Sequence, residues 1–245
     1  MPNSVSRSIV LFHLIVILNT LPSLWSAVYQ EYTYEDHGDY LRITEYSGEI
    51  EWEVFVPGEI NGKPVRVIAE ETFIGKATGV IHVPDNVTTI EDYAFVSSEV
   101  TQVYLSSTVS EVGPLAFSGC WQLDEILVDV ENEVFESIGG DLYSKGGETL
   151  IYVLPSKDRA EAEFQVPQSV RIIGDQAFYR FQDSSILLPL GLEVIGTESF
   201  YGSELITITL PSTVSEIGKF AFGSCDSLGA IEVDGSNQDF SSEDG

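Results

Sequence analysis

The chain has 245 residues, of which 43% are hydrophobic, and its formal net charge at pH 7 is −28. Arg7 is the single charged residue among the first 27, so the rest carries 10 basic residues (11 minus 1) against 39 acidic ones. A field of this sign repels nucleic acid and anionic bilayers, which excludes both as partners.

Residues 1–27 resemble a secretory signal peptide. Arg7 supplies the positive n-region, the stretch from Ile9 to Leu18 is apolar apart from His13, and Ser26-Ala27 forms a small-residue exit. An apolar core of about 15 Å is half of what a bilayer-spanning helix needs. We therefore expect a cleaved leader, a secreted or cell-surface protein, and no membrane insertion after cleavage.

Residues 28–64 are rich in aromatic side chains and lack the repeat that follows them. The first coil of a repeat protein would expose its apolar face, so this segment predicts an N-terminal β cap. Packing within the cap is one interpretation of the aromatics, and a carbohydrate-stacking platform is the alternative. The residues concerned are Tyr29, Tyr32, Tyr34, Tyr40, Tyr46 and Trp52.

Residues 65–245 are organised by a repeat in which a small residue precedes phenylalanine. A fixed period with apolar residues in phase is the signature of a solenoid whose coils bury their faces against one another. Each coil is expected to hold a short strand, a V-x-x-I segment and a turn that places phenylalanine inside. The six positions are Phe73, Phe95, Phe117, Phe178, Phe200 and Phe222, spaced by 22 residues within each triplet.

Residues 129–163 interrupt the period and predict an inserted β-hairpin. Leu142 to Ser144 and Thr149 to Leu154 are strand-like, and Gly146-Gly147 between them supplies the positive φ of a tight turn. The repeat resumes at Phe164.

A longer register relates residues 65–140 to 170–245 without a gap. It aligns Cys120 with Cys225 and Asn132 with Asn237. The sequence stops where a second copy of the hairpin would begin. We therefore expect the C-terminal end to be truncated relative to a longer native solenoid.

The repeat resembles the BspA-type leucine-rich-repeat family, whose coils read approximately L-x-x-I-x-[LI]-P-x-x-V-x-x-I-x-x-x-A-F-x-x-C. Ser106 departs from the usual proline, and Thr72 and Ser199 depart from the usual alanine. The resemblance implies a mostly β solenoid, coiled right-handedly with short turns, that acts as an extracellular protein- or glycan-binding scaffold. The matching positions of one coil are Leu205, Ile208, Leu210, Pro211, Val214, Ile217, Ala221, Phe222 and Cys225.

No motif in the chain predicts catalysis, a cofactor or a metal ion. His37 and His82 belong to none of the known catalytic or metal-ligating patterns. Cys120 and Cys225 fall in different coils, about 15 Å or more apart at roughly 5 Å per coil, which is too far for a disulfide. We expect free thiols and a binding scaffold that is not an enzyme.

Two other functions stay open. A polysaccharide-degrading β-solenoid enzyme would need several carboxylates and a basic partner converging in one cleft. A structural component of a surface matrix would need no selective partner.

The expected partner-binding surface is a row of outward strand residues, His82, Tyr104 and Leu127, with Gln102 and Glu125 beside it. An apolar strip with a polar rim is typical of an interface. The alternative is that the inserted hairpin covers this strip. Asn86, in the sequon Asn86-Val87-Thr88, is the candidate glycosylation site in a eukaryotic source.

Overall fold

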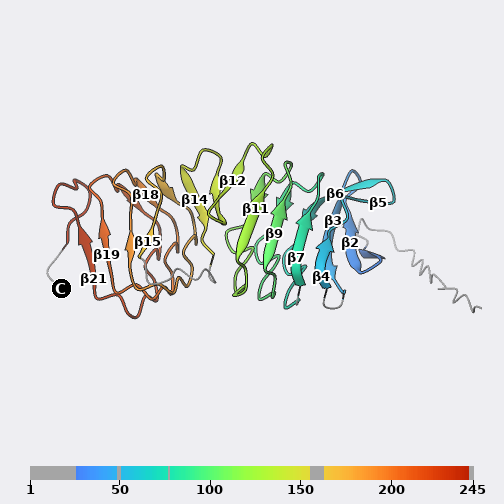
Figure 1. Cartoon of the computed structure of the whole chain (residues 1–245), viewed down its shortest axis with the longest axis horizontal. Helices are drawn as coiled ribbons and strands as arrows, with labels where there is room; N and C mark the ends of the chain where they lie inside the picture. The colour runs from blue at the N-terminus through green and yellow to red at the C-terminus, as the bar shows by residue number, and fades with distance from the viewer. Residues whose placement is uncertain (1–25, 49–50, 77, 155–162, 243–245) are drawn as a thin grey trace, which may run out of the picture.

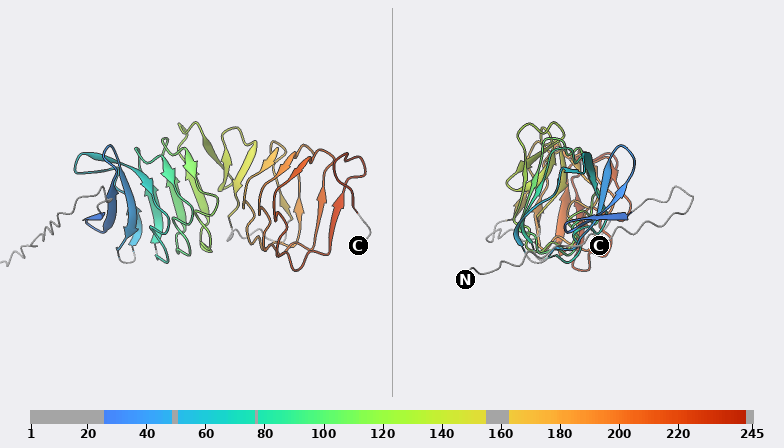
Figure 2. Two further views of the ribbon diagram at one scale, coloured as in Figure 1. Left: turned by 180° about the vertical axis from the view of Figure 1, so that it is seen from behind. Right: turned by 90° about the vertical axis from the view of Figure 1, so that its right-hand side faces the viewer.

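A computed structural model describes residues 26–48, 51–76, 78–154 and 163–242. They form an elongated solenoid of about eight turns that advances along one axis (Figure 1). Seen along that axis, the coils overlie one another (Figure 2). The described residues form strands and turns, with no helix among them. The solenoid predicted from the phenylalanine spacing is confirmed.

The longer strand of each coil pairs in parallel with the next. In the first block, His82 lies opposite Tyr104 and Tyr104 lies opposite Leu127. Side chains alternate across these strands, so Val103 and Leu105 are buried while Tyr104 faces outward. The first block has β4 (Glu51–Phe55), β7 (Thr78–Val83), β9 (Gln102–Leu105) and β11 (Glu125–Val128) in one sheet. The second has the pairs β15 (Phe164–Gln165) with β17 (Ile186–Leu187) and β19 (Thr207–Leu210) with β21 (Ala230–Val233).

The V-x-x-I segments form a second row of shorter parallel strands. The isoleucines that end most of these strands, such as Ile90 and Ile195, are fully buried, and Ile217 in the last coil is partly buried. The strands are β6 (Lys63–Ile68), β8 (Thr89–Ile90) and β10 (Glu111–Val112), then β16 (Ile172–Ile173), β18 (Val194–Ile195) and β20 (Glu216–Ile217). The two strand rows and the turns between them enclose the core.

The N-terminal cap is an antiparallel meander that continues directly into the coils. Its strands are β1 (Ser26–Tyr29), β2 (Tyr32–Asp36) and β3 (Leu41–Tyr46), and β5 (Glu59–Ile60) pairs with β6. Parallel pairing already begins at β3 with β6 and at β4 with β7. The segment 28–64, expected to be a separate cap, therefore also supplies the strands of an initial coil. The expected leader at 1–27 lies outside the described residues, apart from Ser26 and Ala27 in β1.

Two tyrosines of the cap pack inside, as one interpretation of its aromatics predicts. Tyr32 and Tyr46 are almost fully buried, and the Tyr46 ring lies 5.3 Å from that of Phe73. Trp52 is different, because 90% of its surface is exposed.

The inserted hairpin is confirmed, with one more strand than expected. Strands β12 (Phe135–Ile138), β13 (Asp141–Ser144) and β14 (Thr149–Tyr152) form an antiparallel meander, and Gly146 and Gly147 have positive φ in its second turn. Strand β14 then pairs in parallel with β16. The insert thereby shares one continuous sheet with the shorter strands of the second block.

The repeated phenylalanines stack along the solenoid axis. Ring centroids lie 5.0 Å apart for Phe73–Phe95 and 5.2 Å for Phe95–Phe117, and a second stack begins with Phe178–Phe200 at 4.9 Å. Burying each ring stabilises the fold by about 2–3 kcal/mol. The stack breaks between Phe117 and Phe178, where the insert intervenes.

The register that relates residues 65–140 to 170–245 is also seen in equivalent hydrogen bonds. Cys120 donates its thiol to the Phe95 carbonyl at 2.9 Å, and Cys225 donates to the Phe200 carbonyl at 3.0 Å. Both cysteines are free thiols, as predicted.

Asn132 and Asn237 repeat a second arrangement. The Asn132 Nδ2 group donates to the Ser106 and Val109 carbonyls at 2.9 and 2.8 Å, and Asn237 bonds Pro211 and Val214 in the same way. Each asparagine thus links the C-terminal end of its block to the preceding coil.

Candidate partner-binding surface

The outward positions of the first block bring three aromatic rings together. Phe55, His82 and Tyr104 lie opposite one another on β4, β7 and β9. The ring centroids are 4.3 Å apart for Phe55–His82 and 4.7 Å apart for His82–Tyr104, with interplanar angles of 6° and 11°. We call these three residues the outer aromatic row. The structure therefore places His82 and Tyr104 where the sequence predicted them.

Phe55 is the member of this row that the sequence reasoning missed. It is 64% exposed, against 38% for Tyr104. The signal was the alternation at the end of β4, where Val54 and the following Val56 are buried and Phe55 between them faces outward. Assigning residues 28–64 to a separate cap hid the fact that β4 is in register with the coil strands.

Of the strip predicted from the sequence, the inserted hairpin reaches only the last residue, Leu127. Leu127 is partly buried and lines a groove of about 460 Å³ together with Glu125, Glu136 and Lys145. Tyr104 and Phe55 remain exposed to solvent and are not covered by the hairpin. The alternative in which the hairpin covers the strip therefore applies to Leu127 and not to the aromatic rings.

Polar side chains two residues earlier on the same strands border the row. The Glu53 Oε1 atom lies 2.8 Å from His82 Nε2, and Gln102 Nε2 donates to Glu125 Oε2 at 3.1 Å. The Glu53 contact orients the imidazole between its two ring neighbours. The border is acidic at both ends, with Glu53 on β4 and Glu125 on β11.

Because the rings are stacked, their faces are largely occupied by one another. What the row presents to solvent is its ring edges, with the open face of Phe55 at the margin of the sheet. A sugar ring packs on an exposed aromatic face, whereas protein interfaces use edges and tips as well. The row therefore offers one open aromatic face, that of Phe55, and otherwise ring edges.

The corresponding positions of the second block carry no such row. Gln165 lies opposite Leu187, and Thr209 lies opposite Glu232. Leu187 is 47% exposed but has no aromatic neighbour in these pairs. Among the outward strand positions of the described residues, a row of stacked aromatic rings thus occurs in the first block alone.

A second acidic groove lies on the β8 and β10 side and is lined by Glu70, Glu91, Asp92 and Glu111. Arg42 holds Glu91 through contacts of 3.0 and 2.6 Å and also contacts Glu35 at 3.1 Å. The hydrogen bonds from Arg42 lower the pKa of Glu91, and those to Glu91 raise the pKa of Arg42. Glu91 is therefore ionised and unsuited to serve as a general acid.

No cluster of three or more His, Cys, Asp or Glu side chains suited to a metal ion occurs within residues 26–48, 51–76, 78–154 and 163–242. Across that same part of the chain, no helix is long and apolar enough to cross a membrane. His37 stacks on Tyr40 at 4.9 Å beside Glu35.

Asn86 lies in the turn after β7, as expected, and is exposed with φ of 82°. Its Nδ2 group donates to the Gly58 carbonyl at 3.2 Å. Its glycosylation stays a prediction.

Comparison with solved structures finds leucine-rich repeat proteins, and the first of them supports the same fold. A leucine-rich repeat protein from Eubacterium ventriosum is 18% identical, with a TM-score of 0.55 over 84% of this chain and 71% of that one. The pneumococcal vaccine antigen PcpA is 16% identical, with a TM-score of 0.44 over 86% of this chain and 82% of that one. A leucine-rich cell surface protein from Faecalibacterium prausnitzii is 18% identical, with a TM-score of 0.40 over 91% and 99%.

No curated protein matches the chain in sequence. The model of the BspA type leucine rich repeat region matches residues 59–150 and 158–243, with six copies of the repeat. These two ranges hold both phenylalanine stacks, the insert strands β12 and β13, and His82 and Tyr104 of the outer aromatic row. The chain therefore belongs to the BspA-type leucine-rich repeat family.

Proposed function

We propose that the chain is a secreted or cell-surface scaffold that binds a protein partner through the outer aromatic row. The observation that carries this proposal is the stacking of Phe55, His82 and Tyr104 on an outward strand face, where the phenylalanine remains 64% exposed. The secreted location rests on the leader-like composition of residues 1–27.

The rigidity of the row favours binding. The rings are fixed by parallel strand pairing and by one another, so little conformational entropy is lost when a partner covers them. Buried aromatic anchors dominate interface energetics, and the surrounding polar rim excludes water.

The acidic rim defines the chemistry of the partner. Glu53 and Glu125 flank the row, and the whole chain has a net charge of −28. A partner with an apolar patch bordered by Lys or Arg is both steered toward this face and complementary to it.

The proposal is tested by selecting ligands on the immobilised chain from a displayed peptide library and, in parallel, from a glycan array. Enriched peptides should combine apolar and basic residues and should be lost on the Phe55→Ser/Tyr104→Ser variant. Glycan hits that disappear on the same variant would instead support a carbohydrate-binding role. Ligands retained equally by both proteins would contradict this surface.

Polysaccharide hydrolysis is a second candidate, because the acidic groove gathers Glu70, Glu91, Asp92 and Glu111 beside Arg42. It is disfavoured because Glu91 is held ionised by Arg42. Reducing-sugar release from acidic and neutral polysaccharides, abolished in Glu111→Gln, would establish it.

A further inference from the structure

The turns that carry the phenylalanines are joined coil to coil by backbone hydrogen bonds. In the second coil, the amide groups of Tyr93, Phe95 and Ser97 donate to carbonyls of the third coil at 3.2, 2.8 and 2.8 Å. The first coil does the same toward the second, and the pattern resumes after the insert, where Phe178 and Arg180 donate at 2.7 and 2.8 Å. Every such amide points along the axis in the C-terminal direction.

The equivalent amides of the third coil belong to Leu115, Phe117 and Gly119, one repeat further on. None of these three N–H groups forms a hydrogen bond with a described residue. The cause is the insert. Instead of another turn, the third turn meets Tyr152, whose hydroxyl donates to the Phe117 carbonyl at 3.0 Å and leaves the amides without acceptors. Amide donors that have no partner within the protein can bind an added acceptor, so this edge favours one.

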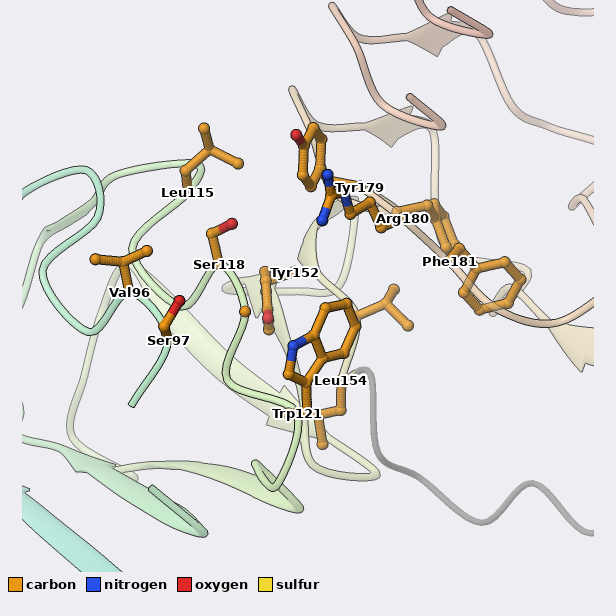
Figure 3. A pocket seen from close by; sticks show the side chains of 13 residues that line it. Val96, Ser97, Leu115, Ser118, Trp121, Tyr152, Leu154, Tyr179, Arg180 and Phe181 are labelled. Carbon is orange, nitrogen blue, oxygen red and sulfur yellow. The ribbon is translucent and has the colours of Figure 1, made fainter. Parts of the chain in front are cut away.

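A cleft of about 160 Å³ opens at this edge, between the two blocks (Figure 3). Leu115, Ser118 and Gly119 line one wall, and Tyr179, Arg180 and Phe181 line the other. In Figure 3 Tyr152 lies between the walls, and the indole of Trp121 closes one end. A cleft of this size is too small to enclose an oligosaccharide or a large cofactor, but it admits one or two residues of an extended chain whose remainder lies along the turn 115–119.

The opposite wall also presents hydrogen-bond donors. The Arg180 side chain lies over the Tyr179 ring, 5.7 Å from its centroid, and its guanidinium forms no ion pair or hydrogen bond with any described residue. A free guanidinium prefers a carboxylate, which it binds with two parallel hydrogen bonds. Donors on both walls require an occupant rich in acceptors.

We propose that this cleft is a peptide-binding site, distinct from the outer aromatic row. An extended segment of a partner protein lies along the turn 115–119, and its carbonyl oxygens accept from the amides of Leu115, Phe117 and Gly119. A carboxylate of the same segment, from a side chain or a C-terminus, binds Arg180. The segment thus replaces the turn that the insert displaced, which is strand-like addition to an exposed backbone edge. Local pairing with Arg180 outweighs repulsion from distant acidic residues, because those are screened beyond about 8 Å at physiological salt.

Amide hydrogen exchange followed by NMR tests the proposal, with acetyl-Ala-Leu-Ala-Asp-amide as the probe. In the free chain, Leu115 and Gly119 should exchange at least about tenfold faster than their bonded counterparts Tyr93 and Ser97. Saturating probe should slow both at least about tenfold. Exchange that is already slow in the free chain, or that the probe leaves unchanged, would overturn the site.

Three comparisons separate the parts of the proposal. The Asn counterpart of the probe should bind about tenfold more weakly than the Asp probe, and Arg180→Gln should remove that preference while the amides stay protected. The acid acetyl-Ala-Leu-Ala-Ala shows whether a C-terminal carboxylate serves instead of the side chain. The Phe55→Ser/Tyr104→Ser variant should bind the probe unchanged, so failure of the outer aromatic row leaves this site intact. Protection of Phe220 and Ser224 in place of Leu115 and Gly119 would contradict the assignment, because these occupy the same positions in the last described turn.

Discussion

Tyr152 closes the first phenylalanine stack by donating from its hydroxyl to the carbonyl oxygen of Phe117 at 3.0 Å, with the two rings 5.5 Å apart. The insert therefore ends one stack and supplies the sheet strand β14 from which the next block continues. This single residue links the core of the first block to the insert.

We expect Tyr152→Phe to lower the free energy of unfolding by about 1 kcal/mol, since it removes one enclosed hydrogen bond and keeps the ring. Tyr152→Ala should lower it by about 3–5 kcal/mol because it also leaves a cavity. Urea denaturation measures both. Equal effects of the two substitutions would show that the ring does not close the stack.

Tyr152 also predicts a pH dependence. Its ring keeps some exposure, but burial of the hydroxyl raises the pKa well above 10.0. A raised folded-state pKa means that the stabilisation is complete below about pH 10 and is lost as the pH rises above that value, because only the unfolded chain ionises there. The wild-type chain should lose stability above pH 10 more steeply than Tyr152→Phe. Parallel curves would contradict this assignment.

Thr72 and Ser199 stand where the repeat usually has alanine, so replacing each of them by alanine gives a matched pair of variants. The Thr72 hydroxyl donates to the carbonyls of Ile43 and Ala69, whereas the buried Ser199 Oγ makes no hydrogen bond with a described residue. Ser199→Ala should raise the free energy of unfolding by about 1 kcal/mol, and Thr72→Ala should lower it by a similar amount. Changes of the same sign in both variants would refute this distinction.

The Arg42–Glu91 pair predicts a loss of stability in acid. Arg42 lowers the pKa of Glu91 below 4.5, so the stabilisation is present above that pH and is lost as the pH falls through the folded-state pKa. The pair is partly exposed, so Glu91→Gln should cost about 0.5–1 kcal/mol at pH 7. At pH 3 the difference in stability between the wild-type chain and Glu91→Gln should be smaller. The more exposed Lys63–Asp36 pair serves as the comparison, and Asp36→Asn should change stability less than Glu91→Gln at pH 7.

The cysteines should differ in reactivity although they occupy equivalent positions. Cys120 is fully buried, and burial raises the pKa of its thiol to about 11, whereas Cys225 is only partly buried. Iodoacetamide at pH 8 should therefore modify Cys225 first and leave Cys120 protected until the chain unfolds. Peptide mass spectrometry reads both sites. Early modification of Cys120, or a bridge between the two cysteines, would contradict the structure.

Much of the fold could be predicted because a solenoid repeats the same local interactions. The phase of Phe95 and Phe117 predicts the stack, and alternation in β9 places Tyr104 outside. Strand ends are less predictable: Ile206 fits the apolar alternation of β19 but is 57% exposed, because the strand begins only at Thr207.

The junction could not be predicted from local patterns. The cleft depends on how the insert displaces one turn, which is a long-range consequence of β14 joining β16. The place of Phe55 in the outer aromatic row could not be predicted for a similar reason, because its register with His82 depends on the pairing of β4 with β7. Neither the cleft nor the place of Phe55 corresponds to a characteristic residue of the repeat.

The dissociation constant of a selected peptide, measured by calorimetry, tests binding through the outer aromatic row most directly. The wild-type chain is compared with Phe55→Ser/Tyr104→Ser and with the matched control Leu187→Ser, an exposed strand position of the second block. If the row is the interface, the double variant should bind at least about 30-fold more weakly, since aromatic anchors contribute about 2 kcal/mol or more. Leu187→Ser should bind normally, and all three should share one unfolding midpoint. Unchanged affinity in the double variant, with its fold intact, would contradict the proposed function.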